Sequence, residues 1–236
     1  MRAFTVALGL LALTLCPRAT PADDSEPKQK EVKTVKVGDN VVLEIGAKKR
    51  VIVQAEVCLT KGRLEGLLTR AKKKEHEYIL AADVDARHIH TALELAGAEA
   101  GSPVVFDPKY KAAHGTKVKI SLRYVKDKKS VMVPASDFIR HHKTKKALDQ
   151  DWVFGGSKFV KDPNDQKAKP FYVANHGDLV CVVNMDSAML DLPVASPKAL
   201  DDRVWEANSD KIPKEGTKVE VIFEPVIEKK KEKKDK

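Results

Sequence analysis

The sequence predicts an α+β protein, a single strand-rich domain with mostly antiparallel strands and one helix packed on a sheet face. Three observations predict this class. Short runs rich in β-branched and aromatic residues recur through residues 33–227. A well-capped helical pattern occurs at about residues 86–96. No internal repeat or low-complexity linker divides the region, so the 236 residues fit one domain between two short ends.

The first strands are expected before residue 83. Gly38-Asp39-Asn40 and the stretch 46–49 are turn signals between them, because glycine, aspartate and asparagine favour tight turns. The runs that predict strands in this part are VKTVKV (32–37), VVLEI (41–45), RVIVQAEVCL (50–59) and EHEYILAA (75–82).

The helix follows at about residues 86–96. Asp85 is a suitable N-cap residue, and Gly97 is a suitable terminator. The apolar positions between them have the i, i+3, i+4, i+7 spacing of one buried helix face: Ile89, Ala92, Leu93 and Ala96. A second, shorter helix of one or two turns is expected within residues 135–142, where Ser136 is a candidate cap.

The remaining strands are expected on both sides of that short helix. KDKK at 126–129 predicts a hairpin turn, and NHGD at 175–178 predicts a tight hairpin between its flanking strands. The runs are PVVF (103–106), KVKISLRYV (117–125), SVMVP (130–134), DWVFGGSKFV (151–160), PFYVA (170–174), DLVCVV (178–183) and KVEVIFEPV (218–226).

Residues 1–22 have the layout of a secretory signal peptide. Arg2 precedes an apolar run of about 14 residues, and small residues lead to a cleavage position after Ala22. The run is shorter than the ~20 residues of a membrane span, so we expect an exported, periplasmic or extracellular chain without a transmembrane segment. Lipoprotein anchoring through Cys16 is disfavoured, because bulky Leu15 precedes the cysteine where lipoprotein processing needs a small residue.

Much of the net positive charge lies in the N-terminal leader and in the C-terminal tail. Residues 23–32 are a polar lead-in, and residues 228–236 (EKKKEKKDK) are expected to be a disordered lysine-rich tail. Leader and tail together account for more than half of the net charge of +9, which leaves residues 23–227 only mildly basic. Aromatic residues, at 6%, are too few for a nucleic-acid groove. The tail is instead expected to be solubilising or to touch an anionic surface.

Two cysteines remain once the leader is removed. Cys58 and Cys181 both lie in apolar runs, as buried strand residues do. In an oxidising compartment they could form one disulfide, and two separately buried thiols are the alternative. Two thiols are too few for an iron–sulfur cluster with four cysteine ligands.

Common catalytic motifs are absent from the sequence. There is no GxxxxGK[ST] phosphate loop, GxGxxG turn, GxSxG elbow, HExxH helix or CxxC pair. The sequence therefore favours a non-catalytic protein and assigns no catalytic residue and no cofactor.

The densest chemical cluster is Glu75-His76-Glu77, which Lys74 precedes and which His90 follows on the expected helix. Carboxylates and imidazoles are ligands of divalent metals. On a strand, however, the two glutamates share one face while His76 points to the other. A metal site of Glu75, His76, Glu77 and His90 and a set of ordinary structural polar groups are the two interpretations.

Several segments of the chain resemble the YdjY-domain family of exported bacterial proteins. The similarity runs from about Val41 to Val226. The segments that carry it are VCLTKGRLEGL (57–67), KEHEYIL (74–80), LELAGAEAG (93–101), FDPKY (106–110), DWVFGGSKFV (151–160), DLVCVVN (178–184) and SAMLDLP (187–193).

The resemblance implies an exported domain without an established activity. Some family members are described as ferredoxin-like or iron–sulfur proteins, which the two thiols of this chain do not support. Residue by residue, the resemblance carries over Glu75, His76, Glu77 and His90. The other matching segments include Asp151, Trp152, Ser187 and Asp191.

Two hypotheses for the function follow. The first is an exported, non-catalytic domain that binds a protein or polymer at the cell envelope. The second is a metal-binding protein or metal-dependent enzyme that uses the Glu75, His76, Glu77 and His90 cluster.

Overall fold

The computed structural model describes residues 32–161, 164–165, 167–196 and 203–227. These residues belong to one compact unit. The expected signal peptide, nearly all of the polar lead-in and the lysine-rich tail lie outside the described residues. Within the described part, no helix is long and apolar enough to cross a membrane.

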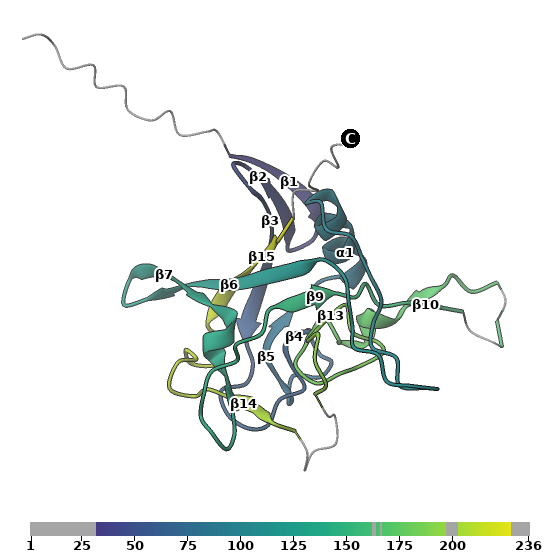
Figure 1. The fold of residues 1–236 in the computed structure, drawn as a ribbon. Helices are drawn as coiled ribbons and strands as arrows, with labels where there is room; N and C mark the ends of the chain where they lie inside the picture. Colours follow the sequence, from purple (N-terminus) through teal and green to yellow (C-terminus); the bar gives the residue numbers. More distant parts are fainter. Residues whose placement is uncertain (1–31, 162–163, 166, 197–202, 228–236) are drawn as a thin grey trace, which may run out of the picture. The chain divides into compact units, whose positions relative to one another are not determined.

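Eight of the described strands form a closed barrel (Figure 1). Around the barrel the order is β3 (Lys49–Val57), β15 (Lys218–Pro225), β6 (Lys117–Lys126), β9 (Trp152–Phe154), β13 (Leu190–Asp191), β12 (Val180–Cys181), β4 (Gly66–Arg70) and β5 (Tyr78–Ala82). The barrel closes at β3, since one edge of this strand pairs with β15 and the end of its other edge pairs with β5. The β12–β13 and β4–β5 pairs are parallel, and the other barrel pairs are antiparallel.

Further strands extend the barrel or lie beside it. β1 and β2 continue the sheet from β3, and β7 forms a hairpin with β6. Two small sheets pair β8 with β14 and β10 with β11. The bounds are β1 (Lys33–Gly38), β2 (Val41–Ile45), β7 (Lys129–Pro134), β8 (Ile139–His141), β10 (Phe159–Val160), β11 (Phe171–Tyr172) and β14 (Trp205–Ala207).

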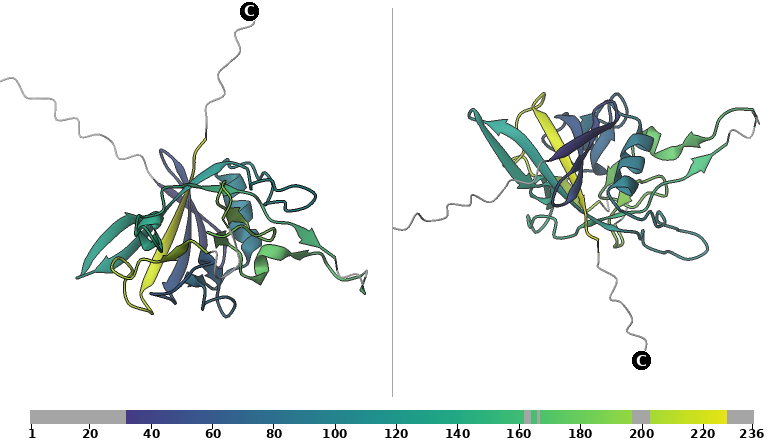
Figure 2. Two further views of the ribbon diagram at one scale, coloured as in Figure 1. Left: turned by 60° about the horizontal axis from the view of Figure 1, so that its bottom comes forward. Right: turned by 90° about the horizontal axis from the view of Figure 1, so that it is seen from above.

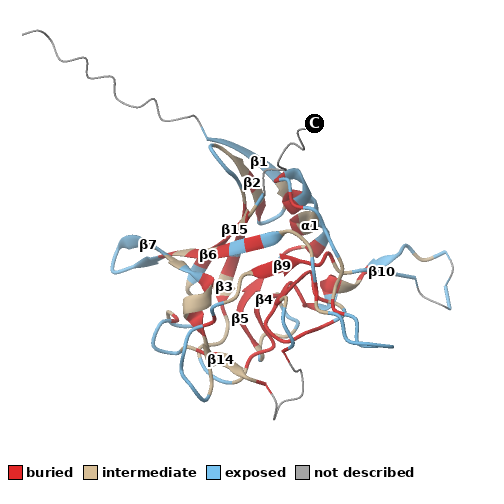
Figure 3. Ribbon diagram, in the orientation of Figure 1, coloured by how far each residue is buried: buried red, intermediate tan, exposed pale blue. Residues whose placement is uncertain are grey.

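The barrel interior is the hydrophobic core (Figure 3). The alternation that predicts β6 and β15 also decides their inward faces, because successive strand residues point to opposite sides. On β6 the buried side chains are Val118, Ile120, Leu122 and Tyr124, and on β15 they include Val219, Val221 and Phe223.

The single helix of the described residues, α1 (Ala86–Leu95), forms as the sequence predicts. The Asp85 carboxylate accepts a hydrogen bond from the main-chain N–H of Arg87, and Gly97, at φ +100°, ends the helix. The N–H of Ala98 reaches back to the carbonyl of Leu93, which completes a Schellman motif. The buried face of the helix contacts β1, β2 and β3.

The prediction of a strand-rich domain with one helix and mostly antiparallel pairs is confirmed. The KDKK turn also joins β6 to β7 as expected, with Asp127 and Lys128 both at positive φ. The sheet is more specific than expected, since it closes on itself as a mixed barrel.

Several element predictions are wrong. The expected helix at 135–142 is a 3₁₀ turn, Ala135–Phe138, followed by β8. The chain is extended from Ile139 onward because β8 pairs with β14, where Ile139 lies opposite Ala207. The NHGD segment makes no hairpin: Val173–His176 is a second 3₁₀ turn, and the strands around it pair with different partners.

Other strands are shorter than their apolar runs or were not expected. Residues 75–77 belong to the connection before β5, and within 103–106 only Val105 pairs, as an isolated bridge with Lys111. β4, β8, β13 and β14 were missed, because two- to five-residue strands depend on their partners and leave little periodicity in the sequence.

Candidate functional site

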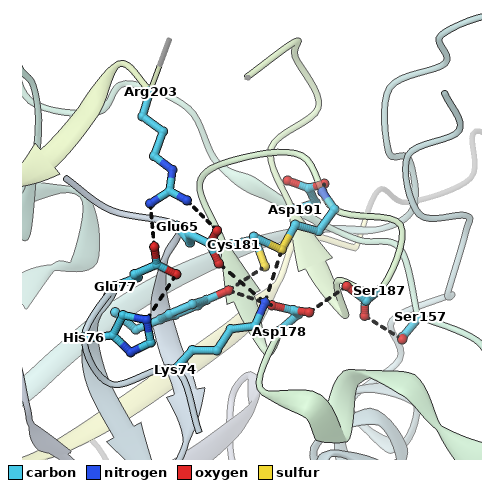
Figure 4. A network of polar contacts seen from close by, with 12 residues as sticks. Glu65, Lys74, His76, Glu77, Ser157, Asp178, Cys181, Ser187, Asp191 and Arg203 are labelled. Atoms are coloured by element: carbon cyan, nitrogen blue, oxygen red, sulfur yellow. Dashed lines mark hydrogen bonds and ion pairs between the residues drawn. The ribbon is translucent and has the colours of Figure 1, made fainter. Parts of the chain in front are cut away.

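A buried network of charged and polar side chains lies where the family-matching segments meet (Figure 4). At its centre, Lys74 Nζ donates to Asp178 Oδ1 at 2.7 Å and lies 3.4 Å from Glu65 Oε2. Lys74 comes from the connection before β5, Asp178 directly precedes Leu179 and β12, and Glu65 precedes β4. Residues distant in sequence are thus brought to one point by the barrel closure.

The carboxylates of Glu65 and Asp178 are almost completely buried, at 4% side-chain exposure each, whereas the Lys74 side chain is 27% exposed. Burial opposes the charge of Lys74, but the hydrogen bond and charge of Asp178 outweigh it and raise the pKa of the lysine. Burial likewise opposes the Asp178 charge, but bonds from Lys74 and Ser187 leave the pKa of Asp178 lowered. The resting pair is an ammonium and a carboxylate.

Hydroxyl groups complete the shell around Asp178. Tyr78 Oη donates to Asp178 Oδ1 at 2.9 Å, and Ser187 Oγ donates to Asp178 Oδ2 at 2.6 Å. The Ser187 carbonyl in turn accepts from Ser157 Oγ at 2.7 Å. Both oxygens of the carboxylate therefore have hydroxyl donors, and the loop between β12 and β13 is held to the loop after β9.

Tyr78 itself fits because its neighbour in the barrel is a glycine. A Cβ at position 66 would lie 2.1 Å from Tyr78 Cε1 and 2.4 Å from the Val180 carbonyl oxygen. The fully buried Tyr78 ring therefore fits against β4 only because residue 66 has no side chain. The Tyr78 hydroxyl lies 3.4 Å from Cys181 Sγ. Burial is the main cause that raises the pKa of Tyr78.

A second charged group flanks the centre. Arg203 donates to Glu65 Oε1 at 2.6 Å and to Glu77 Oε1 at 2.9 Å. Although burial opposes ionisation of Glu77, Arg203 lowers the pKa of this carboxyl. Glu77 is thus a structural ion-pair partner that joins the β4–β5 connection to the segment before β14.

Asp191 forms a separate buried group beside this network. Its carboxylate accepts from the main-chain N–H of Leu192 at 2.7 Å, the N–H of Met185 at 3.2 Å and Asn184 Nδ2 at 3.3 Å. These donors do not outweigh the loss of water, so burial raises the pKa of Asp191 to about 7. Asn184 also accepts from Tyr110 Oη at 3.0 Å, which ties the FDPKY loop to the barrel.

The structure does not assemble the expected metal cluster. His76 is 76% exposed and lies 3.7 Å from Glu77, while Glu75 accepts from the Lys72 N–H. His90 instead lies on α1, where its Nδ1 is 2.8 Å from Tyr172 Oη and its ring packs edge-on against Phe154. Among the described residues, no group of three or more histidine, cysteine, aspartate or glutamate side chains is arranged to hold a metal ion.

The two cysteines are free thiols in the structure. Cys58 Sγ donates to the Tyr78 carbonyl oxygen at 3.2 Å, whereas Cys181 Sγ lies at the hydroxyl of the same tyrosine. The sulfurs are therefore held at opposite ends of Tyr78, and of the two alternatives the structure has separate thiols rather than a disulfide. Burial, and next the charge of Glu75, raise the pKa of Cys58 to about 12.

Of the remaining family-matching residues, Trp152 is buried and Asp151 is half-buried just before β9. Trp152 Nε1 donates to the Cys181 carbonyl oxygen at 2.7 Å. This bond links β9 to β12 across the intervening β13, so the tryptophan holds in place the strand that follows Asp178.

Comparison with known proteins identifies the family. A family model, the YdjY domain, matches residues 45–224. The chain belongs to the YdjY domain family. No curated protein and no solved structure matches it significantly.

Sequence reasoning about this YdjY domain found the correct segments but not their central residues. Lys74 was noted only as the neighbour of the Glu75–Glu77 cluster, and Asp178 only as part of the NHGD turn and of the apolar run that follows it. The sequence does hold one signal for Asp178, which directly precedes the apolar run LVCVV. Where a charged residue beside a buried strand is itself buried, its charge requires a partner.

Proposed function

We propose that this YdjY domain is an exported, non-catalytic binding module that docks on an anionic lipid surface at the cell envelope. The observation that carries the proposal is a face on which exposed aromatic side chains alternate with lysines. Two segments make this face: the loop 105–111 and the described residues around β10 and β11, which are 158–161, 164–165 and 167–171. We refer to them together as the aromatic–lysine face.

Both segments project from the barrel on the same side in every view (Figures 1 and 2). Their apolar side chains point away from the core: Phe106 is 56% exposed and Phe159 is 60% exposed. Further exposed apolar residues on the two segments are Val105, Tyr110, Val160 and Phe171. Exposed aromatic rings gathered on projecting segments are typical of interaction surfaces rather than of solvated loops.

Lysines flank these rings on both segments. The exposed ones are Lys109, Lys111, Lys158, Lys161, Lys167 and Lys169. A lysine near an anionic bilayer contributes about 1 kcal/mol of attraction, and an aromatic ring suits the interface between headgroups and acyl chains. The combination therefore complements a negatively charged lipid surface better than a neutral polymer.

The buried network supports a non-catalytic role. Asp178 is occupied by Lys74, Tyr78 and Ser187, and Glu65 by Arg203 and Lys74. Each strong donor or acceptor in this set is thus neutralised by another residue of the domain, as in structural ion-pair networks.

Vesicle sedimentation tests the proposal. The purified chain is expected to bind vesicles rich in phosphatidylglycerol and to bind phosphatidylcholine vesicles weakly, with binding reduced by salt. Replacing Phe106, Phe159 and Phe171 by serine should weaken binding by about a hundredfold or more, since each buried ring contributes more than about 1 kcal/mol and about 1.4 kcal/mol is tenfold.

The matched control lies on the β6–β7 hairpin. Val125 and Met132 are 66% and 60% exposed, so replacing both by serine removes exposed apolar side chains away from the face. This variant should bind like the wild type. Equal loss in both variants, or equal binding to neutral and anionic vesicles, would contradict the proposal. Removal of residues 228–236 measures the contribution of the lysine tail separately.

A further inference from the structure

Lys74 and Asp178 form an unusual ion pair for the interior of a small domain. Their side chains meet at 2.7 Å, 104 positions apart in the sequence. Two members of a small buried cluster (Tyr78, Cys181, Val183, Met185 and Ala188) contact the pair: Tyr78 through its hydroxyl and Met185 through its sulfur. Met185 Sδ lies 3.7 Å from Lys74 Nζ, and Glu65 Oε2 lies 3.4 Å from the same nitrogen. The Lys74 ammonium thus lies between two almost completely buried carboxylates and is itself only 27% exposed.

We propose that Lys74 and Asp178 condense in the folded domain to form a side-chain amide, an internal isopeptide bond. The proposal concerns a covalent modification of the chain by itself and is independent of lipid binding. Contact between the reacting groups is already made by the fold, and such fixed proximity is equivalent to effective concentrations of about 10⁵–10⁸ M.

The chemistry balances without any added reactant. The ammonium of Lys74 holds three protons, and one must leave before the nitrogen lone pair can attack Asp178 Cγ. That proton protonates the Asp178 carboxylate, so a neutral amine faces a neutral acid. The new C–N bond forms, a second amine proton passes to the leaving oxygen, and the C–O bond breaks to release one water. One N–H remains on the amide.

Neighbouring side chains have defined roles in this step. Glu65, close to Lys74 Nζ, is placed to take a proton from the amine and return it to the leaving oxygen. The hydroxyls of Tyr78 and Ser187 donate to the two Asp178 oxygens and so stabilise the negative charge that develops when the nitrogen adds. The apolar cluster limits water, which opposes hydrolysis of the product.

The product would fasten two separate parts of the barrel. It would join the connection before β5 to the residue that precedes β12, next to the parallel β4–β5 pair. A link across about 100 residues restricts the unfolded chain in the same way as a long-loop disulfide, and the two cysteines of the domain form none.

Peptide mass spectrometry of the purified, trypsin-digested wild-type chain tests the proposal directly. Trypsin cannot cleave after an acylated lysine, so the expected result is a cross-linked species of peptides 74–87 and 168–198, lighter than their sum by one water. Release of free peptide 75–87, which requires an unmodified Lys74, should be correspondingly depleted. Quantitative release of 75–87 with no cross-linked species overturns the proposal, and so does a water loss mapped elsewhere.

Variants identify the roles. Asp178→Ala is expected to restore peptide 75–87, and Glu65→Gln to lower the linked fraction at least tenfold while thermal unfolding confirms a folded domain. The matched control is the surface pair Lys158–Asp186, which meets at 2.6 Å but is 47% and 60% exposed. It should remain unlinked. A link at that pair as well would show that burial and Glu65 are unnecessary. The wild-type digest decides the matter even if a variant fails to fold.

Discussion

At the residue scale, Asp191 is the carboxyl group whose ionisation the fold opposes. It is 1% exposed, and burial raises its pKa to about 7, whereas an unfolded aspartate titrates near 3.8. Between these two values the folded chain keeps a proton that the unfolded chain has released. Stability therefore falls as the pH rises from about 4 to about 7, and this contribution is constant above that range.

The first prediction concerns this pH dependence. Replacing Asp191 by asparagine should remove a slope of up to about 1.4 kcal/mol per pH unit from the unfolding free energy between pH 4 and pH 7. The variant should be less stable at low pH, because its amide N–H₂ would face one of the present N–H donors. Urea unfolding at several pH values measures both effects.

Asp186→Asn is the control for this prediction. Its carboxylate is 60% exposed and pairs with Lys158 on the surface, so the slope should stay as in the wild type. An Asp191→Asn variant with an unchanged slope would mean that another group titrates in this range.

At the element scale, Tyr172 fastens three elements together. Its hydroxyl donates to the Gly156 carbonyl oxygen at 2.7 Å and accepts from His90 Nδ1 on α1 at 2.8 Å. The single hydroxyl proton of Tyr172 is donated to the Gly156 carbonyl oxygen. The hydrogen bond between Tyr172 and His90 therefore requires a proton on His90 Nδ1. His90, a candidate metal ligand in the sequence, thus links α1 to β11 and, through Tyr172, to the loop after β9.

The second prediction follows from these bonds. Tyr172→Phe should lower the unfolding free energy by about 1–3 kcal/mol, since the buried Gly156 carbonyl loses its donor while the ring contacts remain. A double-mutant cycle with His90→Leu separates direct coupling from general damage. Coupling of about 1 kcal/mol is expected between the two sites, whereas additive effects would exclude the hydrogen bond as the link.

At the scale of the whole molecule, barrel closure protects the two thiols unequally. Cys181 lies on β12, a barrel strand paired with β4 and β13, and is fully buried, whereas Cys58 lies just beyond the end of β3 and is half-buried. Exposure of Cys181 requires the strands around it to separate, which is global unfolding. Exposure of Cys58 requires only local opening near the end of one strand.

The third prediction is therefore a difference in labelling. In increasing urea below the unfolding midpoint, iodoacetamide should modify Cys58 first, and Cys181 should react only with the free energy of global unfolding. Peptide mass spectrometry distinguishes the two sites. Equal rates would contradict the closed barrel as the protecting unit, and labelling that starts only after reduction would indicate a disulfide.

The sequence alone determined the elements whose signals are local. The cap at Asp85, the terminator at Gly97 and the alternation of 117–125 act within a few residues, so the helix and the long strands were predicted with nearly correct bounds. The YdjY-domain resemblance, too, rests on segments that can be read along the chain.

Only the tertiary structure decided how these segments meet. The pairing of β3 with β5, which turns the sheet into a barrel, and the two-residue strands depend on partners far away in the sequence. For the same reason the sequence left open whether the Glu75–Glu77 cluster and His90 form one site, whereas Lys74 and Asp178 became neighbours only in the fold. A buried charge is stable only beside its partner, and long-range chain closure, not local pattern, selects that partner.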